Sequence, residues 1–428
     1  MQPGIFIGID LGTSGCRIYA IDENKHILAS SNQSGEASVI KNNHVTQDPS
    51  HWWLNCQQAL NDVLTKIDRT AVKSISIDGT SGTVLLCETD GKAISPAYMY
   101  NDAACTDEAL LIRNIAPDTS GAHGTSSGLS KCLNLHKQFN RDDVICLNQA
   151  DWIAGQFLNQ FDTSDENNAL KMGYDPVNRE WPDWVQQLEC FKALPDKILP
   201  PGTASGNICA EKAQLFKLPA ETKIVAGTTD SIAAFIATGC DNIGEAVTSL
   251  GSTLAIKLIS ERPVFAPEYG VYSHRLGNKW LVGGASNAGG AVLKSYFDDE
   301  ALQKLSREIN PETPTRLDYY PLQSPGERFP INNPNKSPVL TPRPKEDHIF
   351  LQGMLEGIAD IEKMAFDKLV ELGAPDPTRI ITMGGGSQNE VWRNIREKMC
   401  RIPVSNAEIS EAAYGSALLA RQAFKQLK

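Results

Sequence analysis

Asp10 stands at the end of a short apolar run, directly before a turn rich in glycine and hydroxyl residues. The preceding residues, Ile5–Ile9, predict a β-strand. A carboxylate in this place can reach a metal-bound phosphate without covering the backbone amides of the turn, and Mg²⁺ usually takes one or two carboxylates together with phosphate oxygens. The alternative is that Asp10 only caps the turn. By itself the residue fits both interpretations.

Two turns in the chain place small hydroxyl residues beside glycine. Thr13-Ser14-Gly15 follows the first strand, and Gly251-Ser252-Thr253 follows the predicted strand Glu245–Leu250. Successive amides and hydroxyls can bind phosphate oxygens, and glycine permits backbone conformations that a side chain would obstruct. The repetition gives the pattern its weight, because two such turns can grip nucleotide phosphates from opposite walls. Two ordinary hairpin turns are the alternative.

Asp230 lies where the predicted strand Lys223–Ala226 gives way to an apolar, helix-like run that begins at Ile232. It can be the N-cap of that helix. A carboxylate at such a junction can also act as a general base and accept the proton of an attacking hydroxyl group. Both interpretations stay open on this residue alone.

Three consecutive glycines, Gly384-Gly385-Gly386, follow the predicted strand Ile380–Met383, and Asn389 and Trp392 come next at helical spacing. Glycines let a helix approach a flat ligand closely, which fits an adenosine pocket. A plain strand-to-helix turn beside a core tryptophan is the alternative. The string matches neither GxGxxG nor GxxxxGK[ST], so neither a Rossmann nor a P-loop protein is supported.

The elements that must position these residues form two similar halves. The first half begins with an antiparallel meander and a helix, predicted over Ile5–Asp10, Cys16–Ile21, Ile27–Ala29 and about Asp48–Leu64. The second half begins near residue 243 with another strand, hydroxyl-rich turn and strand, which predicts a duplicated domain. A long helix is predicted over Phe350–Leu372, after an irregular proline-rich connection, Pro311–Pro344.

Length and composition limit the kind of protein. A chain of 428 residues should hold two large domains. Its 40 basic and 51 acidic residues give a net charge of −11, the wrong sign for a nucleic-acid surface. Ten cysteines without a CxxC pair indicate reduced thiols rather than a zinc knuckle or a disulfide framework. With no long apolar run, we expect a cytoplasmic protein without a membrane partner.

Taken in order, the motifs resemble those of the FGGY carbohydrate kinases over nearly the whole chain. The resemblance rests on Gly8–Ser14, Gly227–Asp230, Ser249–Thr253, Gly283–Gly290, Met383–Ser387 and Glu411–Ala417. It implies an α/β fold of two ribonuclease-H-like, actin-like ATPase domains around a central cleft. Residues 1–237 with 411–428 would form the sugar-binding domain, closed by a final helix from about Glu411 to Leu427, and residues 238–410 the ATP-binding domain.

The resemblance also implies roles for individual residues. Asp230 matches the catalytic base and Asp10 the aspartate near Mg²⁺, and both would contact the sugar. Thr13 and Ser14 in the first turn, with Gly251, Ser252 and Thr253 in the second, match the phosphate-binding turns. Gly385, Gly386 and Asn389 match the adenosine motif. Mg²⁺ and ATP are therefore expected, with a small sugar as the other partner, in a monomer or homodimer.

Departures from the family pattern bear on the substrate. Many relatives carry glutamine-methionine-histidine-glycine where this chain has Asp78–Thr83, and their W-x-D-x-R pattern reads Tyr100–Ala104 here. The short chain and Thr80–Thr83 resemble the cyanobacterial and plant-type branch associated with D-ribulose, whose sugar-contacting serine Ser81 matches. We therefore expect phosphorylation of a ketopentose, D-ribulose first. A xylulokinase or polyol kinase is the alternative, and an actin-fold ATPase switch or chaperone is the alternative of another class.

Overall fold

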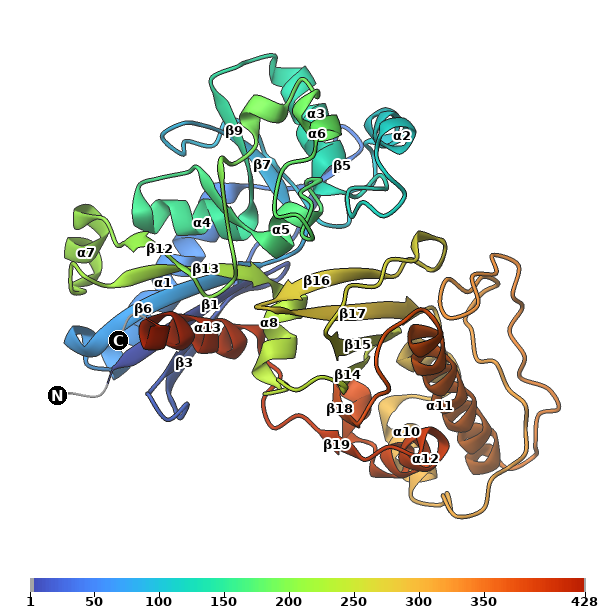
Figure 1. The fold of residues 1–428 in the computed structure, drawn as a ribbon. Coiled ribbons are helices and arrows are strands. Elements are labelled where there is room, and N and C mark those ends of the chain that lie inside the picture. The colour runs from blue at the N-terminus through green and yellow to red at the C-terminus, as the bar shows by residue number, and fades with distance from the viewer. Residues whose placement is uncertain (1–3, 427–428) are drawn as a thin grey trace. The chain divides into compact units, whose positions relative to one another are not determined.

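Two compact units make up the computed structural model, which describes residues 4–426 (Figure 1). Within these residues the first unit runs to Gly239 and resumes at Glu411, and the second is Cys240–Ser410. Each unit contains a six-stranded mixed sheet with helices against it. The expected α/β fold class is confirmed.

The central sheet of the first unit has the strand order β12-β13-β6-β1-β2-β3. Antiparallel neighbours β1, β2 and β3 form the expected meander, and β6 and β13 run parallel to β1. Nearly every residue of β1 is buried, as in strands covered on both faces. The strands are β1 (Ile5–Gly12), β2 (Gly15–Ile21), β3 (Ile27–Ser34), β6 (Val72–Gly79), β12 (Ala204–Asn207) and β13 (Lys223–Thr229).

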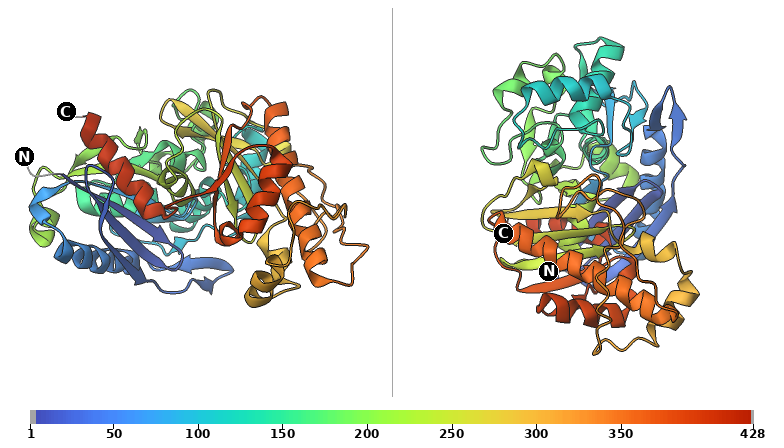
Figure 2. Two further views of the ribbon diagram at one scale, coloured as in Figure 1. Left: turned by 90° about the horizontal axis from the view of Figure 1, so that it is seen from below. Right: turned by 90° about the vertical axis from the view of Figure 1, so that its right-hand side faces the viewer.

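Helices from distant parts of the chain cover this sheet (Figure 2). On one face, α1 and α4 pack with Ile7 and Ile9 in a common apolar core. α13 packs against β1, β6 and α8. This contact is so close that a Cβ on Gly8 would lie 2.0 Å from the Ala413 carbonyl oxygen. The helices are α1 (Pro49–Lys66), α4 (Gln149–Leu158), α7 (Ala210–Phe216), α8 (Asp230–Ala237) and α13 (Ala412–Gln426).

α13 confirms the expected final helix and its return to the first unit. The expected last residue of that helix, Leu427, lies outside the described residues. α1 likewise confirms the expected first helix, because Asp48 is its N-cap and accepts a hydrogen bond from the Ser50 amide. The first helix follows from local sequence signals that tertiary packing supports, whereas the final helix was expected from the resemblance to the family.

A second, five-stranded sheet belongs to the first unit and has its own apolar core. Its strand order is β4-β5-β8-β7-β9, and α3 packs against β7 and α2. The elements are β4 (Val39–Lys41), β5 (His44–Gln47), β7 (Val84–Glu88), β8 (Ala97–Tyr98), β9 (Val144–Asn148), α2 (Thr106–Ile115) and α3 (Gly128–Phe139). Smaller elements complete the unit: β10 (Thr163–Asp165), α5 (Glu166–Leu170), α6 (Asp183–Gln186) and β11 (Lys197–Leu199).

The sheet of the second unit repeats the topology of the first. Its order is β16-β17-β15-β14-β18-β19, with β14, β15 and β17 antiparallel and β18 and β19 parallel to β14. The order β17-β15-β14-β18-β19 corresponds to β3-β2-β1-β6-β13, so the expected duplication is confirmed. The strands are β14 (Glu245–Leu250), β15 (Leu254–Ser260), β16 (Tyr272–Leu276), β17 (Lys279–Ser286), β18 (Arg379–Met383) and β19 (Val404–Asn406).

The helices of the second unit include the long one expected from periodicity, α11. They are α9 (Gly290–Lys294), α10 (Asp299–Ser306), α11 (Asp347–Glu371) and α12 (Glu390–Cys400). The proline-rich connection 311–344 contains only isolated β-bridges, as expected. Its aromatic side chains Tyr319 and Tyr320 are nevertheless buried in the core against α11.

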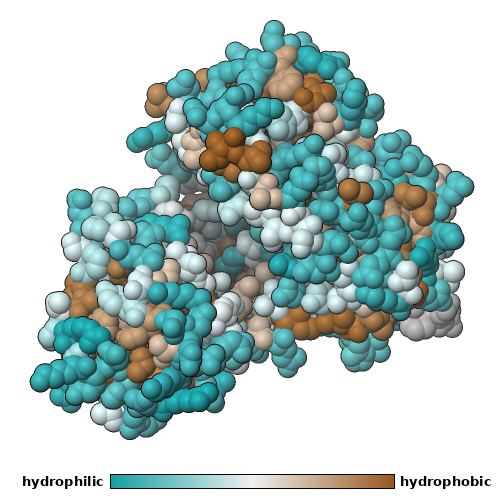
Figure 3. Space-filling model, turned by 180° about the vertical axis from the view of Figure 1, so that it is seen from behind, coloured by the Kyte–Doolittle hydropathy of each residue, from teal (hydrophilic) through white to brown (hydrophobic). Residues whose placement is uncertain are grey.

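Figure 3 shows one face of the surface, on which hydrophilic residues predominate and apolar ones gather in small separate groups. Such scattered apolar residues are normal on a protein surface. None of the helices in residues 4–426 has the length and apolar composition that crossing a membrane requires.

Candidate active site

Three aspartates lie at one edge of the first unit's central sheet. β1, β6 and β13 run parallel, so their carboxyl ends meet at the same edge (Figure 1). Asp10 faces Asp78 in the β1–β6 register, and Thr228 faces Asp78 in the β6–β13 register. Asp230 follows two residues after Thr228 and begins α8. Ligands of open α/β sheets bind at this edge.

The Asp10 side chain is nearly inaccessible to solvent, and its buried position shifts its pKa. Burial raises the pKa of Asp10 to about 6; the hydrogen bond with the Asp78 carboxyl lowers it, and the charge of Asp230 raises it again. The Arg17 guanidinium, 3.5 Å from Asp10 Oδ2, lowers the pKa. A nearby cation stabilises the ionised form of such a buried carboxylate. Asp10 therefore fits the kind of oxygen ligand that Mg²⁺ takes.

Asp78 is a site residue to which we assigned no role from the sequence. It is fully buried, and Ser416 Oγ on α13 donates a hydrogen bond to Asp78 Oδ2 at 2.6 Å. Burial first, and then the charge of Asp10, raise the pKa of Asp78 well above its ordinary range. Two buried carboxyls in contact rarely ionise together, so Asp78 holds the proton and Asp10 the charge. Ile77-Asp78-Gly79 repeats the strand-end pattern of Ile9-Asp10, a signal that could have identified it.

Asp230 is the first residue of α8, whereas Thr229 occupies the N-cap position. The backbone amide of Ser231 donates to Asp230 Oδ1 at 2.6 Å. Asp230 is half-buried, and its carboxylate lies at the positive end of the helix dipole. The simple N-cap interpretation is therefore wrong for Asp230, whose half-buried side chain lies at the sheet edge.

Ser81 lies in the segment between β6 and β7. Within the described part of the chain, buried polar atoms without hydrogen-bond partners occur at Ser81 and on the neighbouring elements α4 and β13. Ser81 Oγ is buried and has no hydrogen-bond partner among residues 4–426, as is also true of Gln149 Nε2 and Thr229 Oγ1. The segment is fixed by Thr80 Oγ1, which bonds to Thr83 Oγ1 at 2.6 Å and to Gln149 Oε1 at 2.9 Å. Buried polar groups usually find a partner, so a polar ligand fits here.

Thr13 and Ser14 form the two-residue turn between β1 and β2. Gln47 Nε2 donates to the Thr13 carbonyl at 3.0 Å, and the Gly35 amide donates to the Ser14 carbonyl at 2.7 Å. The turn is therefore held from behind through its carbonyls, while the Ser14 side chain is exposed. This arrangement leaves polar groups of the turn accessible to a phosphate.

In the second unit, the other hydroxyl-rich turn and the glycine run also share a sheet edge. β14 and β18 run parallel with Ser249 facing Met383, so Gly251 and Gly384 follow neighbouring strand ends. The amide of Gly290, at the start of α9, donates to the Gly251 carbonyl at 2.9 Å, and the Ala291 amide donates to the Ser252 carbonyl at 3.1 Å. Ser252 and Thr253 are exposed.

The three positions after β18 differ in whether the fold requires a glycine. Gly384 has a φ of +85°, and a Cβ on Gly386 would lie 2.7 Å from Leu250 and 2.8 Å from Trp392. A Cβ on Gly385 would meet no atom within 4 Å. The fold therefore requires Gly384 and Gly386, whereas Gly385 leaves open space beside the strand end.

Both the oxygen and the nitrogen of the Asn389 side-chain amide form hydrogen bonds within the second unit. It is the N-cap of α12: its Oδ1 accepts from the Trp392 amide at 3.0 Å, and its Nδ2 donates to Ser306 Oγ at 2.9 Å. Trp392 is buried, and its Nε1 donates to the Leu355 carbonyl at 3.1 Å. Trp392 is thus the core tryptophan of the alternative interpretation.

A buried ion pair fixes β14 and β18 behind these turns. Arg396 Nε and Nη2 on α12 each donate to the Glu362 carboxylate on α11 at 2.6 Å, and both side chains are 1% exposed. Arg396 Nη1 donates to Thr382 Oγ1 on β18, and Thr248 on β14 donates to Glu362. The pair joins two helices and two strands, and neither sequence periodicity nor turn composition indicated it.

Comparisons with known proteins identify one family over nearly the whole chain. Residues 5–237 match the N-terminal domain, and residues 246–424 the C-terminal domain, of the FGGY family of carbohydrate kinases. The xylulose kinase of Escherichia coli (strain K12) is 25% identical, over 91% of this chain and 84% of its own. The gluconokinase of Bacillus subtilis (strain 168) is 22% identical, over 91% of this chain and 81% of its own.

Among solved structures, a xyloylose kinase from Brucella ovis superposes with a TM-score of 0.87 at 22% identity, covering 99% of this chain and 91% of its own. At this identity the likeness shows the fold, and it confirms the expected ribonuclease-H-like, actin-like ATPase architecture.

Proposed function

Because the chain belongs to the FGGY family of carbohydrate kinases, we propose that it transfers the terminal phosphoryl group of Mg·ATP to the terminal hydroxyl of a ketopentose. The preferred substrate is D-ribulose, which becomes D-ribulose 5-phosphate. One observation carries the proposal: three parallel strands deliver Asp10, Ser81 and Asp230 to one edge of the first unit's sheet. Residues 1–237 with 411–428 bind the sugar, and residues 238–410 bind ATP.

Asp230 is the general base in this proposal. Its carboxylate accepts the proton of the attacking hydroxyl while the Ser231 amide holds one of its oxygens. Phosphoryl transfer has a loose transition state, so orientation of the nucleophile contributes more than strong basicity. A half-buried carboxylate at the sheet edge fits this task.

Asp10 is the residue that would hold Mg²⁺, which supplies charge neutralisation at the phosphates. The protonated Asp78 behind it donates toward Asp10 and keeps that carboxylate ionised and oriented. The backbone amides and hydroxyls of Thr13 and Ser14, and of Gly251-Ser252-Thr253, bind phosphate oxygens. Gly385 and Gly386 line the adenosine site, and Asn389 shapes it through the start of α12.

Sugar binding is supported by spare hydrogen-bonding capacity at the edge of the sheet. Ser81 Oγ can donate or accept, Gln149 Nε2 can donate, and Thr229 Oγ1 can do both. A ketopentose offers several hydroxyls and a carbonyl to such groups. The small Ser81 side chain occupies little space beside these groups.

D-xylulose is the second candidate, because the E. coli relative that is 25% identical bears the name xylulose kinase. D-ribulose and D-xylulose differ only in configuration at one carbon. A hydroxyl that loses its buried partner costs about 1–3 kcal/mol, so a single misplaced hydroxyl changes the ranking by about tenfold or more.

A panel of D-ribulose, D-xylulose, L-ribulose, ribitol, gluconate and glycerol tests the proposal through ADP release and mass analysis of the sugar product. The proposal expects strong stimulation of ADP release by a ketopentose, with one phosphate on the sugar. ATP hydrolysis that no sugar stimulates would instead favour an actin-fold ATPase switch.

A further inference from the structure

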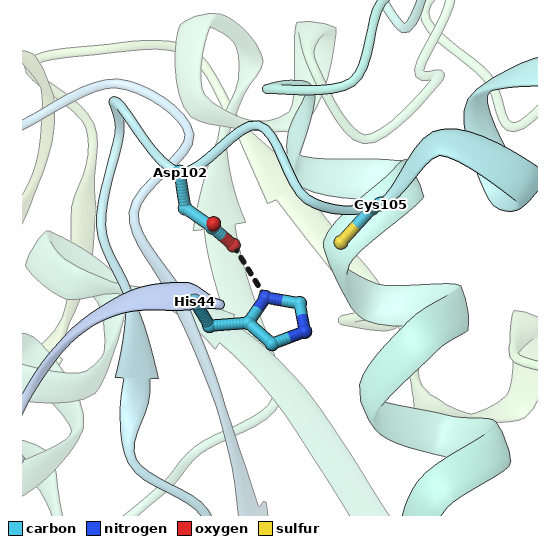
Figure 4. Close-up of side chains that lie close together, drawn as sticks. All are labelled: His44, Asp102 and Cys105. Atoms are coloured by element: carbon cyan, nitrogen blue, oxygen red, sulfur yellow. Dashed lines mark hydrogen bonds and ion pairs between the residues drawn. The ribbon is translucent and has the colours of Figure 1, made fainter. Parts of the chain in front are cut away.

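His44 converges in the interior of the first unit with Asp102 and Cys105, which both lie in the connection between β8 and α2 (Figure 4). His44 begins β5, Asp102 lies in the connection after β8, and Cys105 is the N-cap residue of α2. All three are buried, and one donor atom from each lies within 4.8 Å of the others. We propose that these side chains form a binding site for a divalent transition-metal ion, Zn²⁺ by preference.

The imidazole and the carboxylate are already oriented. His44 Nδ1 lies 2.8 Å from Asp102 Oδ2, and the His44 ring stacks on Tyr98 with centroids 4.0 Å apart and planes at 14°. Asp102 Oδ1 accepts from the backbone amides of Val45 at 3.3 Å and Ala104 at 3.4 Å. Ligands fixed by such surrounding contacts lose little freedom when an ion binds.

The chemistry of the donors selects the class of ion. Imidazole nitrogen, carboxylate oxygen and thiolate sulfur together suit Zn²⁺ and its neighbours in the transition series. Mg²⁺ and Ca²⁺ prefer oxygen alone, so this site is distinct from the magnesium site proposed at Asp10. A neutral imidazole, a carboxylate and a thiolate together carry two negative charges, which balance one divalent cation.

Without an ion the thiol of Cys105 stays protonated. Burial, followed by the charges of Asp102 and Glu108, raises the pKa of Cys105 to about 12, while Lys131 lowers it. The ion takes the place of this proton when the sulfur binds it as a thiolate. Lys131 lies close enough for its charge to act on Asp102 and Cys105, and its Nζ donates to the Gly82 and Met99 carbonyls, each at 2.7 Å.

The geometry requires a small adjustment. Ligand bonds to Zn²⁺ of about 2.0–2.3 Å place neighbouring donor atoms about 3.3–3.8 Å apart. The donor atoms lie within 4.8 Å of one another, so the most distant pair must approach by at most roughly 1 Å. Rotation of the Cys105 side chain can supply this approach, and the ion would replace the hydrogen bond between His44 Nδ1 and Asp102 Oδ2.

The site would tie β5 to the start of α2. It also lies beside the connection whose Met99 carbonyl is joined through Lys131 to Gly82, the neighbour of Ser81. The ion is therefore expected to stabilise the scaffold of the β6–β7 segment. The inference rests on donor chemistry alone and does not depend on the proposed function.

The test measures metal in the full chain without reference to kinase activity. Protein produced in zinc-supplemented medium and dialysed against a weak chelator is analysed by mass spectrometry for bound zinc. In parallel, the chain is refolded with Co²⁺, whose visible absorption reports tetrahedral geometry and whose ultraviolet charge-transfer band reports a thiolate ligand. We expect about one ion per chain, together with a raised Tm.

Matched variants locate the ion. C105S should lose the charge-transfer band and H44Q should lose tight binding, whereas C132S, which removes another buried thiol of the same unit, should keep both. Circular dichroism tests whether each variant folds. If C105S does not fold, H44Q is the variant that locates the ion. Absence of bound ion in the wild-type chain by both routes would overturn the inference, as would equal binding by C105S or H44Q.

Discussion

Asp10 and Asp78 occupy facing positions on the parallel strands β1 and β6, and their carboxyls interact in the interior at the end of the sheet. Ser416 on the last helix donates to Asp78, so a residue near the end of the chain helps to position an aspartate near its beginning. Because two adjacent buried carboxyls cannot both ionise easily, the pair divides into a protonated Asp78 and an ionisable Asp10.

Asp10→Asn should change the pH dependence of stability in the absence of Mg²⁺ and ATP. The pKa of Asp10 rises from 3.8 to about 6 on folding, so the stability that its protonated form contributes is complete below about pH 4 and lost as the pH rises through 6. Asparagine removes this loss. The variant should match wild type near pH 4 and exceed it at pH 7, by up to about 3 kcal/mol.

Urea unfolding at pH 4 and pH 7 measures this difference. A free energy of unfolding that differs equally between the two proteins at both pH values would contradict the proposed burial of an ionisable Asp10.

Asp230→Asn should lower kcat by about 10²-fold or more, because the attacking hydroxyl loses its base. ATP affinity, measured by calorimetry, should stay nearly unchanged. Asp298→Asn is the matched control, since Asp298 caps α10 and has no proposed role in chemistry. Near-normal turnover by Asp230→Asn would leave the residue with only a structural part at the start of α8.

Gly385→Val should weaken ATP binding without loss of stability, because a side chain there meets no protein atom and would enter the space assigned to adenosine. Gly386→Val is the contrasting variant, since its side chain collides with Leu250 and Trp392 and should lower Tm. The two are compared by calorimetry with ATP and by thermal unfolding. Normal ATP affinity in Gly385→Val would mean that the nucleotide lies elsewhere.

Arg396→Met should destabilise the second unit by about 3–5 kcal/mol, because it leaves Glu362 buried without its partner. Arg393→Met removes an exposed ion pair with Glu390 on the same helix and should cost only about 0–1 kcal/mol. Denaturant unfolding distinguishes them. Equal effects of the two substitutions would show that burial does not govern this pair.

Local patterns predicted much of the fold. The meander of β1, β2 and β3 follows from apolar alternation and turn residues, and α11 follows from helical spacing over one continuous stretch. The duplicated topology could be expected from the two similar turns, Thr13-Ser14-Gly15 and Gly251-Ser252-Thr253. These signals lie within a few residues of one another, so a single sequence contains them.

What sequence reasoning missed depends on partners that are far apart in the chain. Asp78 lies beside Asp10 because of the register of β6 against β1, and it accepts a hydrogen bond from Ser416 on α13. The Glu362–Arg396 pair needs the packing of α11 on α12, and the His44–Asp102 contact needs β5 beside the connection after β8. Apart from the strand-end pattern at Asp78, nothing local distinguishes such residues from ordinary surface charges.

The most direct measurement of the central claim compares wild type with Ser81→Ala for kcat/KM on D-ribulose and D-xylulose, with sugar-independent ATP hydrolysis as the internal control. Wild type should prefer D-ribulose, and the variant should lose about tenfold or more on D-ribulose while its background hydrolysis stays the same, because one buried hydrogen bond to the sugar is gone. A wild-type preference for D-xylulose, or an unchanged kcat/KM for D-ribulose in Ser81→Ala, would contradict the account.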